Sequence, residues 1–366
     1  MSETNENVAT NTKELQVMRY RYEKEKKKAK LFFFLFVILI LAVTAVSVFI
    51  LIPDRKQAVE TSASLAKDEE VIKELKTELT TTLDEKEQAI AEKEVLAENV
   101  RQAGFFYDVD VRFMRKVFPD FIVTNGTDGF QFFPIDTSLP LHSYDWNLLS
   151  KNGSVTSYVE NDTSLTSFGI DVSKYQGKID WQKVKHDGVD YAFIRLGFRG
   201  YGKEGTIVLD ECYEDNIKEA PKHGIKTGVY FFTQAVTTQE AVEEAQFVLE
   251  HIKGCDISYP IVFDTESVSE SARAESLSAK ERTDIAKAFC DTIAEAGYTP
   301  MIYASLTWYA TALDLAELTD YKKWYAGYEA EPGFPYEFDI WQYSAKGRVN
   351  GIDTDVDVNM SFLPLS

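Results

Sequence analysis

The chain has 366 residues, a charged fraction of 27%, a hydrophobic fraction of 45% and a net charge of −20. This length accommodates one large domain with accessory segments, and the composition is that of a folded protein. A chain this acidic repels nucleic acid phosphates, and its C-terminal half has no basic stripe to offset the repulsion, so nucleic acid is excluded as a partner.

The first 52 residues have the pattern of a membrane anchor. The segment 31–52 is uncharged and apolar apart from Thr44 and Ser47. Its roughly 22 residues, at about 1.5 Å each, would extend about 33 Å and so cross a bilayer core of about 30 Å. The basic stretch before it predicts that residues 1–30 are cytoplasmic and that the rest of the chain is extracellular. A cleaved signal peptide is the alternative, but its apolar core is usually shorter.

Residues 53–103 predict a helical stalk with coiled-coil character. The stretch is rich in Glu, Lys, Ala and Leu, and its apolar residues recur mostly at three- and four-residue steps. A helix of about 50 residues would extend roughly 75 Å. It would hold the C-terminal part away from the membrane, either as a homodimer or as a single solvated helix.

Residues 104–166 predict a small β-rich module or an ordered linker. Short strand-like runs alternate with turn signals such as Asn125-Gly126 and Asn152-Gly153. No motif in this stretch indicates a function.

Residues 167–366 alternate between short apolar runs and helical stretches, which is typical of a parallel sheet. We predict an α/β fold, a TIM-like (β/α) barrel with eight strands and with helices missing near its C-terminal end, where the last three runs leave little room between them. Helices are expected at about 208–223, 238–253 and 279–296. The strand-like runs fall at 168–172, 191–197, 226–232, 259–266, 299–305, 322–328, 338–344 and 356–361.

Polar residues gather where several of these runs end. In (β/α) barrels the carboxyl ends of the strands carry the active site. Polar groups at such positions are costly to bury unless they find partners, so their convergence predicts a site at this end of the barrel. The residues concerned are Asp171, Asp264, Glu266, Tyr303, Ser305, Tyr328, Gln342 and Tyr343.

Asp264 and Glu266 are the acids that most directly suggest a chemistry. They lie two residues apart on one strand-like run, so their side chains project from the same face with Cα atoms about 6.6 Å apart. Two close carboxylates in a shielded site cannot both ionise freely, so one keeps a proton that it can donate near neutral pH. Cleavage of a glycosidic bond requires such an acid. An ion-pair network would place acids in the same way, so the pair by itself leaves catalysis open.

Histidine-led chemistry and a metal site are disfavoured. His142, His186, His223 and His251 lie outside the motifs that carry the candidate acids, and the three cysteines are widely spaced with no CxxC pair. We therefore expect neither a metal nor a cofactor.

Short motifs follow one another in a specific order between residues 168 and 362. They are GIDVS at 169–173, YQG at 175–177, IDW at 179–181, FIR at 193–195, GTIVLD at 205–210, GVYFF at 228–232, FDTE at 263–266, WQYS at 341–344 and VDVN at 356–359. In this order and spacing the chain resembles glycoside hydrolase family twenty-five, the lysozyme family of N-acetylmuramidases.

The resemblance implies roles for the acids. Glu266 would be the general acid and base. Asp264 would orient the N-acetyl group of the substrate or stabilise the cationic transition state. Asp171 and Asp357 would complete the acidic floor of a cleft.

The resemblance also suggests residues that contact the substrate. Ordinary barrel packing explains each single aromatic equally well, and the arginine among them would then pair with an acid of the barrel. Near Asp357, Asp353 and Asp355 are alternatives for its role. The candidates for substrate contact are Tyr230, Tyr303, Trp324, Trp341, Gln342 and Arg195.

We therefore predict a membrane-anchored, extracellular, lysozyme-like muramidase. It would hydrolyse the β-1,4 bond between N-acetylmuramic acid and N-acetylglucosamine in peptidoglycan, with the substrate's own 2-acetamido oxygen attacking the anomeric carbon. The alternatives are a non-catalytic or slow peptidoglycan-binding protein of the cell envelope and an enzyme for another N-acetylated glycan. The intact pair of Asp264 and Glu266 favours the muramidase.

Overall fold

The computed structural model describes residues 67, 70–77, 80–81, 91, 95, 111–126 and 129–365. The chain divides into two compact units, Met1–Glu94 and Val95–Ser366. The expected cytoplasmic tail and the apolar segment 31–52 lie outside the described residues, and no helix within the described part is long and apolar enough to cross a membrane. The described residues of the expected stalk are helical, whereas the coiled coil and the homodimer stay predictions.

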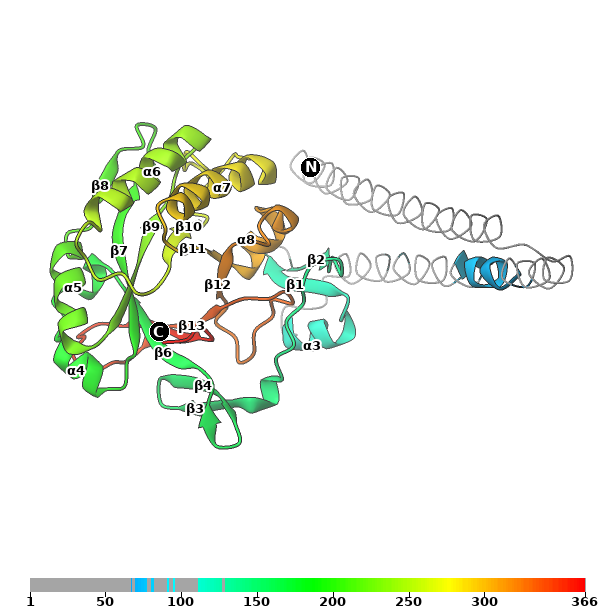
Figure 1. Ribbon diagram of the computed structural model, residues 1–366, viewed down its shortest axis with the longest axis horizontal. Coiled ribbons are helices and arrows are strands. Elements are labelled where there is room, and N and C mark those ends of the chain that lie inside the picture. The colour runs from blue at the N-terminus through cyan, green and yellow to red at the C-terminus, as the bar shows by residue number, and fades with distance from the viewer. Residues whose placement is uncertain are drawn as a thin grey trace, which may run out of the picture. The chain divides into compact units, whose positions relative to one another are not determined.

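Eight strands of the C-terminal unit form a closed sheet, as predicted from the sequence (Figure 1). The sheet order is β6-β14-β13-β12-β11-β10-β9-β7, and a pairing between β6 and β7 closes the ring. A short additional strand, β8 (Ile207–Leu209), pairs antiparallel with the end of β7. It includes the start of a stretch in which the sequence pattern had suggested a helix. The eight barrel strands are β6 (Ser167–Val172), β7 (Tyr191–Arg199), β9 (Lys226–Phe232), β10 (Ile261–Asp264), β11 (Pro300–Ser305), β12 (Lys322–Ala326), β13 (Ile340–Gly347) and β14 (Val356–Ser361).

The barrel differs from the fully parallel sheet that the alternating pattern suggested. Strand β14 runs antiparallel to both of its neighbours, β13 and β6, while the other strands of the ring are parallel. The cause is the short connection of residues 348–355. A parallel connection needs about a dozen or more residues to return to the start of the sheet, whereas a short turn can join antiparallel strands.

Helices flank the strands on the outside of the barrel (Figure 1). The long helices α6 and α7 confirm two of the predicted helical stretches, and the third is shorter than expected. α7 begins at a capping box in which Ser278 and Glu281 satisfy each other's backbone N–H groups. The helices of the barrel region are α4 (Trp181–His186), α5 (Tyr213–Glu219), α6 (Thr238–His251), α7 (Ala279–Glu295) and α8 (Leu306–Thr311), with 3-10 turns η2 (Lys174–Gln176), η3 (Pro221–His223) and η4 (Leu315–Glu317).

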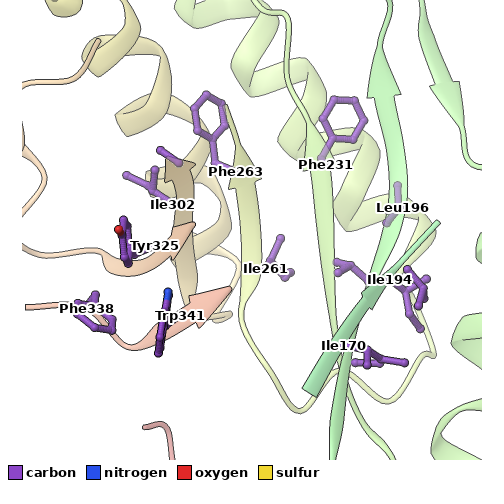
Figure 2. Packing of buried hydrophobic residues seen from close by; sticks show 14 of the residues in the cluster. Ile170, Ile194, Leu196, Phe231, Ile261, Phe263, Ile302, Tyr325, Phe338 and Trp341 are labelled. Atoms are coloured by element: carbon purple, nitrogen blue, oxygen red, sulfur yellow. The ribbon is translucent and has the colours of Figure 1, made fainter. Parts of the chain in front are cut away.

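Side chains alternate between the inside and the outside of the barrel, because successive residues of a strand point to opposite faces. The outward set forms the larger apolar cluster beneath the helices, and Figure 2 shows Ile261, Phe263 and Trp341 within it. The inward set forms a second cluster of large aromatics and aliphatics inside the ring. Its members include Tyr191, Phe193, Tyr259, Val262, Met301, Tyr303, Trp324 and Ile340.

The described residues before the barrel form two small substructures. The N-terminal module (residues 111–134) consists of α3 (Val111–Val117), β1 (Phe121–Gly126) and β2 (Gly129–Pro134), closed by its own apolar cluster. After it come η1 (Trp146–Leu148), β3 (Leu149–Asn152), β4 (Val155–Glu160) and β5 (Thr163–Ser164). The β4 segment packs on the barrel, where the Tyr343 hydroxyl donates to the Ser154 carbonyl and accepts from the Thr156 N–H. Residues 111–165 therefore contain short β-strands and share packing with the barrel.

Candidate active site

The predicted acids come together at the end of the barrel where the parallel strands finish. Asp171 lies in β6 and Asp264 ends β10, while the reversed direction of β14 brings Asp357 to the same end, directly opposite Asp171 in the register. Asp171 is 7% exposed and Asp264 4% exposed, whereas Asp357 is half-buried and Glu266 is exposed. The four carboxyl groups lie close enough to shift one another's pKa values.

Asp264 and Glu266 interact directly. Burial raises the pKa of Asp264 well above its ordinary range, and Glu266 raises it further through its charge and through a hydrogen bond. Loss of hydration also raises the pKa of Glu266, although the same hydrogen bond opposes this shift. The pair therefore keeps a proton at a pH where isolated carboxyl groups would have lost it. Such a pair can supply an acid for bond cleavage.

Asp171 is held by two amide side chains inside the barrel. Its Oδ2 accepts from Gln342 Nε2 at 2.9 Å and from Asn359 Nδ2 at 2.8 Å. Burial raises the pKa of Asp171 well above its ordinary value and Asp357 adds to this, while the two amide hydrogen bonds lower it. The amides therefore orient Asp171 as an acceptor within the acid cluster.

Two tyrosines extend this network toward solvent. The hydroxyls of Tyr303 and Tyr328 each donate to Gln342 Oε1 at 2.8 Å. Tyr303 is buried at the base, whereas Tyr328 is 58% exposed. The structure thus brings Tyr303, Tyr328 and Gln342, three of the strand-end residues named from the sequence, into one network with Asp171.

Arg195 pairs with an acid of the barrel, which is one of the two alternatives that the sequence left open. Its Nη2 and Nε lie 2.7 and 2.8 Å from Asp210 Oδ2. Its guanidinium carbon lies 5.1 Å from the centre of the Tyr175 ring, which is 69% exposed. In the sheet register Arg195 is opposite Tyr230, which is half-buried. The exposed ring of Tyr175, supported by this ion pair, is a surface on which an apolar sugar face could stack.

Direct sugar contact by Trp324 and Trp341 was expected and is wrong, because each side chain is only 1% exposed. Trp324 lies inside the barrel beneath the acids, stacks on Phe193 at 4.5 Å and donates from Nε1 to Asn359 Oδ1 at 2.9 Å. Trp341 points to the outside of the barrel and donates to the Gly327 carbonyl. Trp324 therefore supports the network from below, and Trp341 belongs to the outer core.

Asn359 and Asp210 act in this site although the sequence assigned them no role. Both occur in the quoted motifs, as the last residues of VDVN and GTIVLD. Asn359 lies two residues after Asp357, so the alternation of a strand already places the two on one face. For Asp210 there is no such local signal, because its partner Arg195 belongs to the preceding strand, β7.

The half-buried Asp357 should make the protein less stable as the pH rises. Burial and the charge of Glu266 raise its pKa to about 6 in the folded state. An unfolded aspartate has a pKa near about 3.9, so folding takes up a proton between these values and the free energy of unfolding falls as the pH rises through 6. We expect Asp357→Asn to match the parent at pH 4 and to be more stable by about 1 to 3 kcal/mol at pH 7. Urea unfolding at both pH values measures this difference.

Asp353→Asn is the matched control for this experiment. Asp353 is exposed in the turn before β14, so its replacement removes the same charge away from the acid cluster. An equal gain at pH 7 in both variants would attribute the effect to the net charge of −20 and not to the cluster.

A family model described as glycosyl hydrolases family 25 matches residues 170–352, half of the chain. The match contains Asp171, Asp264 and Glu266 and ends before β14, which carries Asp357. An uncharacterized protein of Escherichia coli K12, YegX, is 30% identical over 208 residues, 54% of this chain and 70% of its own length. Lysozyme M1 of Streptomyces globisporus is 30% identical over 202 residues, 52% of this chain and 66% of its own.

Two solved structures are similar to this chain. The bacterial lysozyme from Streptomyces coelicolor has a TM-score of 0.44 and 26% identity, covering 53% of this chain and 90% of that one. The modular autolysin LytC from Streptococcus pneumoniae has a TM-score of 0.49 and 25% identity, covering 66% of this chain and 61% of that one.

Proposed function

The chain belongs to glycosyl hydrolase family 25 and is therefore a glycoside hydrolase, and from this premise we propose that it is a muramidase anchored in the membrane. The family and its lysozyme relatives support peptidoglycan as the substrate. The bond cleaved is the β-1,4 linkage between N-acetylmuramic acid and N-acetylglucosamine. The observation that carries the proposal is the cluster of Asp264, which ends β10, and Glu266 two residues later, beside a buried, amide-held Asp171.

Glu266 acts first as the acid in the proposed reaction. It donates its proton to the glycosidic oxygen as the bond to the anomeric carbon breaks. The carbonyl oxygen of the substrate's 2-acetamido group forms a bond to that carbon, which gives a cyclic, positively charged intermediate. Water then attacks the same carbon, Glu266 takes a proton from it, and the acetamido group is restored. The enzyme ends in its starting protonation state.

Asp264 stabilises the charge that appears on the acetamido group in this scheme. One of its oxygens, Oδ1, is buried and has no hydrogen-bond partner among the described residues. An acetamido N–H would supply the missing partner, and an ionised Asp264 would stabilise the positive charge of the intermediate. Burial and the charge of Glu266 raise the pKa of Asp264, and the nearby Arg195 opposes this rise. Asp171 and Asp357 complete the acidic surroundings.

Identification of the products tests the proposal. The fragment 104–366 is suitable because it keeps the packing of residues 111–165 on the barrel. Purified peptidoglycan is digested, and the products are reduced with borohydride and identified by mass spectrometry. Reduced N-acetylmuramic acid at the new ends is the expected result. Reduced N-acetylglucosamine would reveal a different bond preference. Retained binding without any cleavage would favour the wall-binding alternative.

We propose further that residues 31–52 span the membrane, with residues 1–30 in the cytoplasm and the hydrolase outside. Support comes from the apolar segment and the basic stretch before it. Anchoring would restrict cleavage to peptidoglycan within reach of the stalk. Protease added to intact spheroplasts should remove the hydrolase and leave a tag at the N-terminus intact. Protection of the hydrolase until the cells are opened would reverse the proposed orientation.

A further inference from the structure

The β12–β13 loop (residues 327–339) carries a residue of the acid-cluster network. Tyr328 lies just after β12, and its hydroxyl donates to Gln342, which in turn donates to Asp171. Tyr328 is exposed, so the loop must hold the ring in place for this hydrogen bond to persist. The barrel holds residue 327 at the start of this loop, because its N–H donates to the Gln342 carbonyl at 3.0 Å and its carbonyl accepts from Trp341.

The N-terminal module holds the next residue of the loop, Glu329, through an ion pair. Glu329 forms a two-pronged ion pair with Arg115 of α3, in which Nη2 and Oε1 are 3.0 Å apart and Nη1 contacts Oε2. Arg115 is itself fixed, because its Nε and Nη2 donate to the Val123 carbonyl of β1 at 3.1 and 3.0 Å. The two side chains are 16% and 28% exposed. A bidentate, partly buried pair of this kind restricts orientation as well as distance.

The same guanidinium contacts the loop a second time. A β-carbon added at Gly333 would overlap the Arg115 side chain, so the backbone of the loop lies directly against it. The Gly333 N–H also donates to the Tyr325 hydroxyl at 3.3 Å. Helix α8 contacts β1 on the same side of the barrel, where Figure 1 draws the N-terminal module next to α8 and β12. The module therefore holds the loop at two points, Glu329 and Gly333.

We propose that Arg115 is a positioning residue of the hydrolase, which acts by holding the β12–β13 loop so that Tyr328 stays bonded to Gln342 beside the acids. The inference rests on the proposed function in taking this acid cluster as the catalytic one. Arg115 lies outside residues 170–352, which match the family, so this support belongs to the added N-terminal module. The module thus contributes to activity and does more than connect the stalk to the barrel.

A double-mutant cycle on the full chain in detergent tests the route of action. Initial rates on soluble peptidoglycan fragments are compared for Arg115→Gln, Tyr328→Phe and the double variant. Misplacement of a site residue costs up to about 100-fold in rate, so we expect Arg115→Gln to lower kcat/KM by about 10-fold or more, with KM raised. In the Tyr328→Phe background the same change should cost less than about 2-fold, because the contact it protects is already lost. Equal losses in both backgrounds would overturn the proposal.

Hydrogen exchange of the loop gives a readout that does not depend on activity. Exchange in the peptide covering residues 327–335, followed by mass spectrometry, should be faster in Arg115→Gln than in the parent. Lys116→Gln is the control, because Lys116 is an exposed neighbour in α3 and its replacement removes the same charge. Arg115→Lys keeps the charge without the fork and should give an intermediate rate. Unchanged exchange in Arg115→Gln would refute the inference, even if the parent enzyme is active. Faster exchange in the variant together with an inactive parent would count against the proposed function and leave the inference in place.

Discussion

Replacement of Glu266 by glutamine is expected to lower kcat on peptidoglycan by about 1,000-fold, within the range that a general acid contributes. Glutamine has nearly the same shape, but it has no ionisable proton to give to the glycosidic oxygen. Glu266 is exposed, so its replacement should leave the fold intact and change KM by only a few-fold. The pKa of Glu266 lies above its ordinary value. In the parent, activity should fall as the pH rises through this raised pKa, because the acid form is then lost.

The leaving group separates an acid role from other roles of Glu266. The dinitrophenolate of a dinitrophenyl glycoside leaves without protonation. Glu266→Gln should therefore cleave such a substrate with a much smaller loss of rate than it shows on peptidoglycan. Glu270→Gln, at an exposed position in the loop that follows, is the matched control and should keep the parent rate. A loss of the same size on both substrates would show that Glu266 does something other than protonate the leaving oxygen.

The strands and the acids at their ends could be predicted because both are local features of the sequence. A buried strand is a short apolar run, and a polar residue at its end is visible without knowledge of the fold. The alternation of a strand, applied strictly, would also have excluded one wrong expectation. Trp341 and Gln342 are neighbours in β13, so they cannot both face the inside of the barrel. Gln342 is the inward residue, bonded to Asp171, and Trp341 is therefore outside.

Features that depend on distant parts of the chain could not be predicted in this way. The two-residue spacing of Asp353, Asp355 and Asp357 would place all three on the same face of a strand. Only the start of β14 at Val356 selects Asp357 as the acid within the sheet. Asp355 instead pairs with Arg348 in the turn. The ion pair of Arg115 and Glu329 joins residues 214 positions apart, and neither residue has a local pattern that points to the other. Such contacts follow from packing and not from periodicity.

Replacement of Asp264 by asparagine should also abolish most of the activity, with kcat lowered by about 100- to 1,000-fold, the range for loss of one preorganised electrostatic contact. Asparagine keeps an oxygen that can accept the acetamido N–H, so substrate binding and KM should change little. The amide cannot carry the negative charge that stabilises the cyclic intermediate, and the loss should therefore appear in kcat. Burial raises the pKa of Asp264 well above its ordinary range, so the folded parent bears the free-energy cost of ionising this group at pH 7. Removal of this group should leave the variant at least as stable as the parent at pH 7, so unfolding cannot explain the loss.

Azide distinguishes stabilisation by Asp264 from covalent catalysis by it. In the proposed scheme the acetamido oxygen occupies the face of the anomeric carbon that an enzyme nucleophile would attack, so azide should neither restore the rate of Asp264→Asn nor form a glycosyl azide of inverted configuration. If Asp264 were the nucleophile, its removal would open that face, and azide would accelerate the variant and yield the inverted azide. Substrates with a fluorinated acetamido group give an independent check on the parent. Fluorine weakens the attacking oxygen, so kcat should fall steeply with each added fluorine, whereas a covalent enzyme intermediate would leave only a shallow dependence.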